Sequence, residues 1–200
     1  MRWDHLFDDL ESQLEQGMNA DDSEILIEDE RLRLGRLTLH DRIASVVRSQ
    51  DAGGDWSLRL VIGDGSTIAI RVSAFGKDWL SGSVADATGH PQRQVVLPSV
   101  SITGVILTPD QLAASLDPMP DSGARGLTQR LSLAFMLRDL CRRRLTVDVR
   151  TRAGSLHGTF DRIGKDHVDL AMHDPSVPRR RREVTQLRVI PFTELTLILI

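Results

Sequence analysis

The sequence contains few cysteines, lysines and aromatic residues. Its one cysteine, Cys141, excludes an intrachain disulfide and a cysteine-rich zinc module. With no tyrosine, three tryptophans and five phenylalanines, it has few rings on which nucleic-acid bases would stack. No segment approaches the roughly 20 apolar residues of a membrane-spanning helix, and the charged start of the chain is unlike a signal peptide. We therefore expect a soluble protein of the cytoplasm that does not bind membranes.

Charge is nearly balanced overall but unevenly distributed. The chain carries 25 basic and 28 acidic residues, a net charge of -3, which argues against a strongly basic nucleic-acid binder. Residues 1–60 hold 7 basic and 14 acidic side chains, whereas residues 141–200 hold 12 basic and 7 acidic. The sequence thus predicts an acidic N-terminal part and a basic C-terminal part.

The two lysines of the chain mark an internal repeat. Each lies in a Gly-Lys-Asp tripeptide, and each tripeptide lies between a Gly-Ser pair and an apolar segment that ends in proline. Two copies in this order indicate a tandem duplication and not a solenoid, which needs three or more. The landmarks are Gly65-Ser66, Gly76-Lys77-Asp78 and Pro98 in the first copy, and Gly154-Ser155, Gly164-Lys165-Asp166 and Pro191 in the second.

Short alternating apolar segments predict β-strands in both copies. Leu58, Leu60 and Ile62 alternate with other residues before a Gly-Asp-Gly turn, as expected of a half-buried strand and hairpin. Five short antiparallel strands per copy favour a small closed barrel, because closure removes exposed strand edges.

Apolar side chains at helical spacing predict helices outside the repeats. Trp3, Leu6, Phe7 and Leu10 form one stripe in the acidic N-terminal part, which we interpret as a helix and a candidate interaction surface. A second stripe, from Leu127 to Leu140, predicts a helix leading into the second copy. Between these helices, the apolar residues from 37 to 47 predict a further strand.

The fold prediction is mainly β with α-helices: two tandem Sm-like or SH3-like small β-barrels, with an N-terminal helix and an inter-barrel helix. Four segments follow from the sequence. Residues 1–34 form an acidic helical segment, 35–107 the first barrel, 108–126 a linker with a short helix, and 127–200 a helix with the second barrel.

The second copy resembles the Sm-like superfamily. Gly158, Phe160-Asp161 and the Asp166-His167 pair are similar to its first motif, in which a polar residue faces the nucleotide. The Arg-Gly or Lys-His pair of its second motif is absent, and Ile190-Pro191 stands there instead. Over nearly all 200 residues the chain also resembles an uncharacterised actinobacterial family that is often labelled as transcriptional regulators by automated transfer.

Arginine clusters in the second copy are the candidate anion-binding or nucleic-acid-binding site. Guanidinium groups grip phosphates through paired hydrogen bonds, and the second Gly-Lys-Asp turn lies nearby in the sequence. The opposing interpretation is that the arginines lie on a solvated loop or are neutralised by the acidic N-terminal helix of the same or another copy. The Gly-Lys-Asp turn would then serve only to begin a strand, since Trp79 and His167 follow the two turns at equivalent positions. The candidates are Arg142, Arg143, Arg144, Lys165, Asp166, His167, Arg179, Arg180, Arg181 and Arg182.

No catalytic motif is present, and we expect neither an enzyme, a cofactor, a metal site nor a small-molecule substrate. His167, Asp169 and His173 share one strand face, but this spacing is too long for a single ion. The leading hypothesis is a non-catalytic interaction module, a protein-protein scaffold or self-associating adaptor. The alternative is a regulatory RNA- or DNA-binding protein that uses the basic C-terminal barrel.

Overall fold

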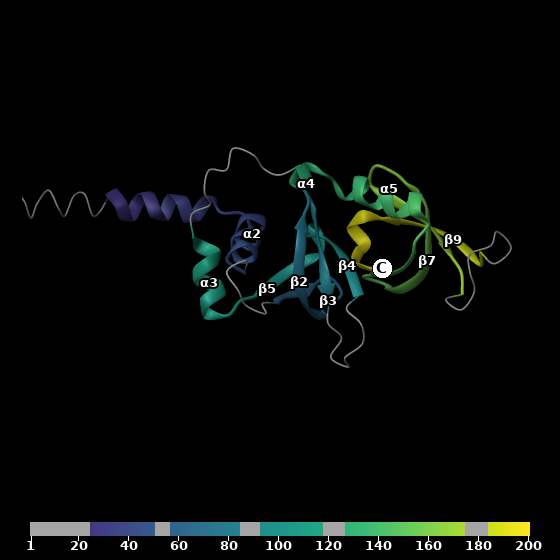
Figure 1. Cartoon of the computed structure of the whole chain (residues 1–200), viewed down its shortest axis with the longest axis horizontal. Helices are drawn as coiled ribbons and strands as arrows, with labels where there is room; N and C mark the ends of the chain where they lie inside the picture. Colours follow the sequence, from purple (N-terminus) through teal and green to yellow (C-terminus); the bar gives the residue numbers. More distant parts are fainter. Residues whose placement is uncertain (1–24, 51–56, 85–92, 118–126, 175–183) are drawn as a thin grey trace, which may run out of the picture. The chain divides into compact units, whose positions relative to one another are not determined.

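The computed structural model describes residues 25–50, 57–84, 93–117, 127–174 and 184–200 (Figure 1). The chain divides into two compact units, Met1–Ile43 and Ala44–Ile200. In the first unit, residues 25–36 form a helix with several exposed apolar side chains. None of the described helices combines the length and apolar character needed to cross a bilayer.

Helix α2, Leu39–Gln50, lies where the sequence predicted a strand. Thr38 and Asp41 cap its start: the Asp41 amide donates to the Thr38 hydroxyl at 3.1 Å, and the Thr38 amide donates to the Asp41 carboxylate at 3.2 Å. Ile43 and Val46, three residues apart, are both buried. The strand prediction is wrong because this capping and helical spacing outweigh the strand preference of the β-branched residues.

The second unit is built on a ten-stranded antiparallel sheet with the order β5-β1-β2-β3-β4-β10-β6-β7-β8-β9. The mainly β class with additional helices is therefore confirmed. The strands of the first repeat are β1 Leu58–Ile62, β2 Thr67–Phe75, β3 Trp79–Val84, β4 Arg93–Pro98 and β5 Ile102–Ile106. Those of the second are β6 Thr146–Thr151, β7 Gly154–Ile163, β8 His167–Met172, β9 Gln186–Pro191 and β10 Leu195–Leu199.

The two repeats have the same strand pattern. In each, the last strand pairs with the first, giving β5-β1-β2-β3-β4 and β10-β6-β7-β8-β9. The long second strand shifts register at equivalent places, between Val72 and Ala74 and between Phe160 and Arg162. A single 3-10 turn, η1 Ser99–Ser101 or η2 Phe192–Glu194, joins the fourth strand to the fifth.

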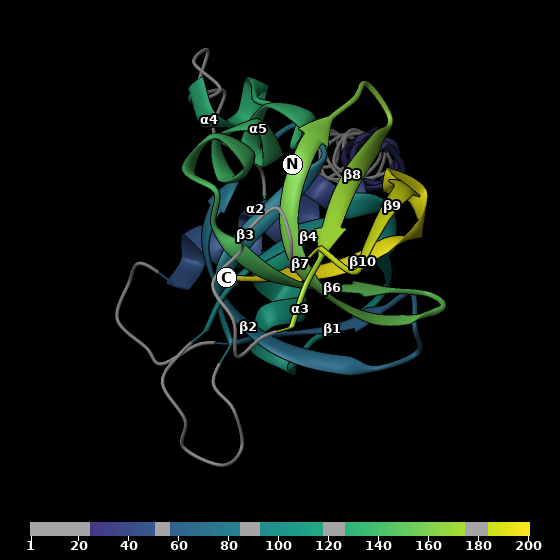
Figure 2. The same ribbon diagram turned by 90° about the vertical axis from the view of Figure 1, so that its right-hand side faces the viewer.

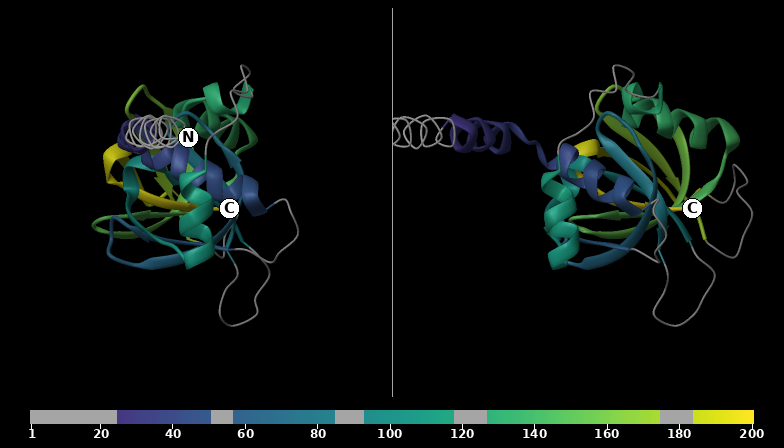
Figure 3. Two further views of the ribbon diagram at one scale, coloured as in Figure 1. Left: turned by 90° about the vertical axis from the view of Figure 1, so that its left-hand side faces the viewer. Right: turned by 60° about the vertical axis from the view of Figure 1, so that its left-hand side comes forward.

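The expected closure of each copy into a barrel is wrong for the described strands. No pairing joins β4 to β5 or β9 to β10; instead β4 of the first repeat pairs with β10 of the second, and the sheet runs through both copies (Figures 1 and 3). Closure was favoured because it removes exposed strand edges, but the sequence of a strand does not show which other strand pairs with it. The result is one open sheet with β5 and β9 at its edges.

Two helices separated by a break replace the single inter-barrel helix. They are α4, Leu127–Arg130, and α5, Leu133–Arg143, and the Ser132 hydroxyl accepts from the Phe135 amide at 3.3 Å to cap α5. Helix α5 packs on β7 (Figure 2). Its buried leucines share one apolar core with residues of both repeats, including Trp79 and Val96 of the first.

Candidate association site

The joint between the repeats is a short antiparallel pairing of β4 with β10. Val96 lies opposite Ile198 and Val95 opposite Leu199, and the Ile200 amide donates to the Gln94 carbonyl at 2.9 Å. Val95 and Val96 are each 1% exposed and Ile198 is fully buried. Main-chain hydrogen bonds and apolar burial therefore hold the two repeats together.

Charged groups add to this joint. The Arg93 guanidinium on β4 hydrogen-bonds to the Asp148 carboxylate on β6, and His157 Nδ1 lies 2.5 Å from the other oxygen of that carboxylate. Burial acts to raise the pKa of Asp148, but the hydrogen bonds from His157 and Arg93, together with the charges of these groups, hold that pKa below its ordinary value. The carboxylate therefore links one strand of the first repeat to two strands of the second.

Strand β9 is the second-repeat counterpart of β4, yet no described strand covers its outer edge. Aligned on the prolines that end both strands, Val189 corresponds to Val96 and Leu187 to Gln94. Val189 is 64% exposed and Leu187 is 65% exposed, against 1% for Val96. An apolar strand edge of this kind is a template for pairing with a further strand.

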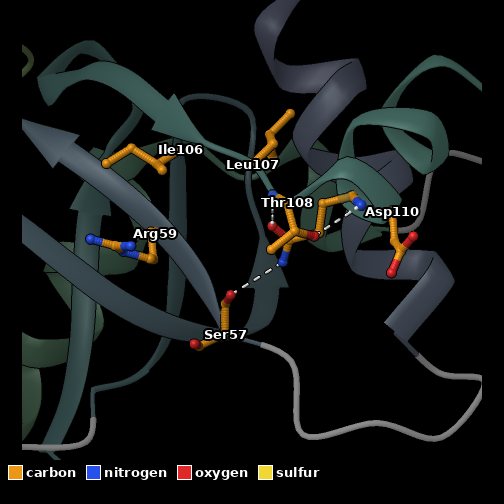
Figure 4. Close-up of a pocket in the computed structure, with 7 residues that line it drawn as sticks. Ser57, Arg59, Ile106, Leu107, Thr108 and Asp110 are labelled. Carbon is orange, nitrogen blue, oxygen red and sulfur yellow. Dashed lines mark hydrogen bonds between the residues drawn. The ribbon is translucent and has the colours of Figure 1, made fainter.

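Strand β5 is the first-repeat counterpart of β10 and forms the other open edge. Ile106 corresponds to Leu199 in the two strands that follow the 3-10 turns; Ile106 is 40% exposed and Leu199 8%. A cavity of about 540 Å³ adjoins this edge, between Arg59 on β1 and the start of α3, Pro109–Leu116 (Figure 4). Arg59 lies opposite Ile106 as Asp148 lies opposite Leu199. The two positions are therefore equivalent, and at the joint between the repeats Asp148 contacts Arg93.

The two Gly-Lys-Asp turns also differ in what covers them. The first binds the start of α5: the Lys77 amide and Trp79 Nε1 donate to the Leu131 carbonyl at 2.8 and 3.0 Å. In the second turn Lys165 and Asp166 are exposed, and His167 Nδ1 lies 2.8 Å from the Asp166 carboxylate. The hydrogen bond from His167 is the main cause that lowers the pKa of Asp166.

The predicted arginine site is only partly within the described residues. Arg142 and Arg143 both pair with Asp139, at 2.7 Å each. Arg144 follows as the left-handed C-cap of α5, with φ 53°. The loop arginines Arg179, Arg180, Arg181 and Arg182, and the N-terminal surface of Trp3, Leu6, Phe7 and Leu10, lie outside the described residues.

Sequence reasoning missed the exposed strand edges and a second repeated motif. The edge at Val189 could not be recognised because a strand's own sequence does not reveal whether a neighbour covers it. The motif was visible in the sequence, since Arg36-Leu37-Thr38-Leu39 at the start of α2 matches Arg130-Leu131-Ser132-Leu133 at the start of α5.

No family model, curated protein or solved structure matches this chain. Among the described residues, no group of three or more histidine, cysteine, aspartate or glutamate side chains is placed to hold a metal ion.

Proposed function

We propose that this chain is a non-catalytic self-associating module, built from two Sm-like repeats that join head to tail through β9 of one copy and β5 of the next. A helix, five antiparallel strands and a 3-10 turn between the last two strands recur in the second repeat, which supports the Sm-like interpretation. The partner is a second copy of this chain.

The observation that carries the proposal is the contrast between Val189 and Val96. Each valine lies two residues before the proline that ends its strand, and the two strands are equivalent. Val96 is nevertheless buried beside β10, whereas Val189 is 64% exposed. In the first repeat, β5 is the counterpart of β10. The β5 edge of a second copy can therefore pair with β9 in the way that β10 pairs with β4 within one chain. Main-chain pairing of this kind is a known mode of association.

The register of the outer joint follows from the inner one. Val189 pairs with Val105 as Val96 pairs with Ile198, and the Leu107 amide donates to the Leu187 carbonyl as the Ile200 amide donates to Gln94. Burying the exposed valine and leucine of β9 contributes about 1.5–3 kcal/mol per fully buried side chain.

The test is the size of the full chain in solution. Sedimentation equilibrium is expected to show the wild type associating with increasing concentration and Val189→Lys remaining a monomer, because a lysine at this edge opposes strand pairing. Phe135→Lys on α5 is the matched control, since Phe135 is 54% exposed and lies on a helix that packs on β7, which is not an edge strand. A wild type that stays monomeric at high concentration would falsify the proposal.

The nucleic-acid alternative receives less support from the described residues. Asp139 partly neutralises Arg142 and Arg143. A titration of the full chain with RNA and DNA oligonucleotides at low and high salt decides the matter: salt-sensitive binding that is lost on changing Arg179 to Arg182 to serine would favour the alternative.

A further inference from the structure

The first Gly-Lys-Asp turn is a receptor for the start of a helix. Besides the two hydrogen bonds from Lys77 and Trp79 to the Leu131 carbonyl, the Leu133 amide donates to the Asp78 carboxylate at 2.7 Å. The Leu133 amide is one of the four that an α-helix leaves without an internal partner at its start. The turn thus binds a carbonyl and an amide on either side of the helix cap.

The second turn repeats this backbone geometry. The Gly164 amide donates to the His167 carbonyl at 2.9 Å, as the Gly76 amide does to Trp79 at 2.8 Å. In both turns the aromatic ring lies over the glycine, since an added Cβ would come within 2.0 Å of the Trp79 ring and 2.4 Å of the His167 ring. Within the described part of the chain, no helix start binds the second turn.

A segment that fits this vacant turn exists near the start of the same chain. Arg36-Leu37-Thr38-Leu39 has the sequence pattern of the segment bound to the first turn and the same local conformation. The Leu37 amide donates to the Leu34 carbonyl at 3.2 Å and the Thr38 hydroxyl caps Asp41 at 3.1 Å. Their counterparts, from Leu131 to Thr128 and from Phe135 to Ser132, measure 3.0 and 3.3 Å.

The first leucine of the following helix is buried in one segment and exposed in the other. Leu133 is 3% exposed against the first repeat, whereas Leu39 is 46% exposed. Leu39 therefore occupies the position of Leu133 in a segment of similar local structure, but the Leu39 side chain is not buried.

We propose that the second Gly-Lys-Asp turn binds the Arg36–Leu39 segment of another copy of this chain. The Lys165 amide donates to the Leu37 carbonyl, the Leu39 amide donates to the Asp166 carboxylate, and Leu39 becomes buried. Another copy is the source because the first turn binds the segment that precedes the second repeat, and in the proposed head-to-tail association the repeat after the second is the first repeat of the next chain. This contact rests on the proposed head-to-tail association and deepens it.

Two substitutions at the turn test the contact by opposite effects. Asp166→Ala removes the acceptor, and sedimentation equilibrium of the full chain should show association weakened about tenfold. His167→Trp recreates the ring and N–H donor of Trp79 and should strengthen association several-fold. Asp117→Ala, which removes an exposed carboxylate at the end of α3, is the control and should leave association unchanged.

The outcomes separate this contact from the edge pairing. If Val189→Lys abolishes association while Asp166→Ala behaves like Asp117→Ala, the edge pairing stands and the turn contact is overturned. If the wild type does not associate, the proposed function itself fails.

Cross-linking tests which residues meet in the complex. A chain with Leu37→Cys and another with Lys165→Cys, both carrying Cys141→Ser, should form a disulfide-linked heterodimer when mixed under oxidising conditions, because the proposed hydrogen bond brings their Cα atoms within disulfide range. Replacing the second partner with Ala113→Cys, on an exposed position of α3, should reduce the yield to background. Equal yields would overturn the contact.

Discussion

At the scale of single residues, Asp148 makes the stability of the repeat joint depend on pH. Burial acts to raise its pKa, but the hydrogen bonds from His157 and Arg93, together with the charges of these two groups, lower it overall. A carboxylate with a lowered pKa in the folded state stabilises the protein above its unfolded pKa of about 3.9 and loses that contribution as pH falls through the folded value. Wild-type stability should therefore decrease as pH falls below about 4.

Asp148→Asn removes this contribution. Urea unfolding followed by circular dichroism should show the variant less stable than the wild type at pH 7, with the difference narrowing as pH falls below about 4. Asp117→Asn is the control, because the Asp117 side chain is exposed at the end of α3. An equal difference between Asp148→Asn and wild type at pH 7 and pH 3 would contradict the assignment.

Trp79 and His167 provide a matched pair for a second residue-scale prediction. Trp79 is 5% exposed and its Nε1 donates to the Leu131 carbonyl at 3.0 Å. Trp79→Phe should lower the free energy of unfolding by about 1–2 kcal/mol, since it removes a buried hydrogen bond. His167→Phe at the equivalent turn should change it by less than about 0.5 kcal/mol. Urea unfolding measures both, and equal losses would mean that the Leu131 contact adds nothing.

At the scale of elements, periodicity predicted the strands well and the helix α2 badly. The alternation of Leu58, Leu60 and Ile62 predicts β1 because one sheet face is buried. Around Ile43 and Val46 the same kind of residue was interpreted as a strand, although Thr38 and Asp41 form a helix cap. Local capping chemistry was the stronger signal there.

Helix α5 carries a prediction at this scale, because its apolar face fills the core that both repeats share. Leu137 is fully buried, and Leu137→Ala should lower the free energy of unfolding by about 2–5 kcal/mol through lost burial and the cavity left behind. Urea unfolding of the full chain provides the measurement. Phe135→Ala, on the exposed side of the same helix, should cost far less, and a similar cost for both would contradict this placement of α5.

At the scale of the whole molecule, the sequence revealed the duplication but not its structural consequence. Landmarks as short as Gly-Lys-Asp identify two copies, and the equivalent register shifts show how closely their strands agree. Which edge meets which depends on contacts between residues distant in sequence, such as Val96 and Ile198. The same limit explains why each copy was expected to close on itself.

Association through two different edges can be distinguished from a symmetric dimer by blocking one edge in each of two variants. Head-to-tail association needs β9 from one chain and β5 from another, so it forms closed rings or open filaments. Val189→Lys blocks the first edge and Ile106→Lys blocks the second, and each variant alone should be monomeric. Mixed at equal concentration, they should form heterodimers and nothing larger, because each pair retains one intact β9 and one intact β5. Sedimentation velocity distinguishes these species; a mixture that stays monomeric would exclude the heterologous joint, and larger assemblies would show that other surfaces drive association.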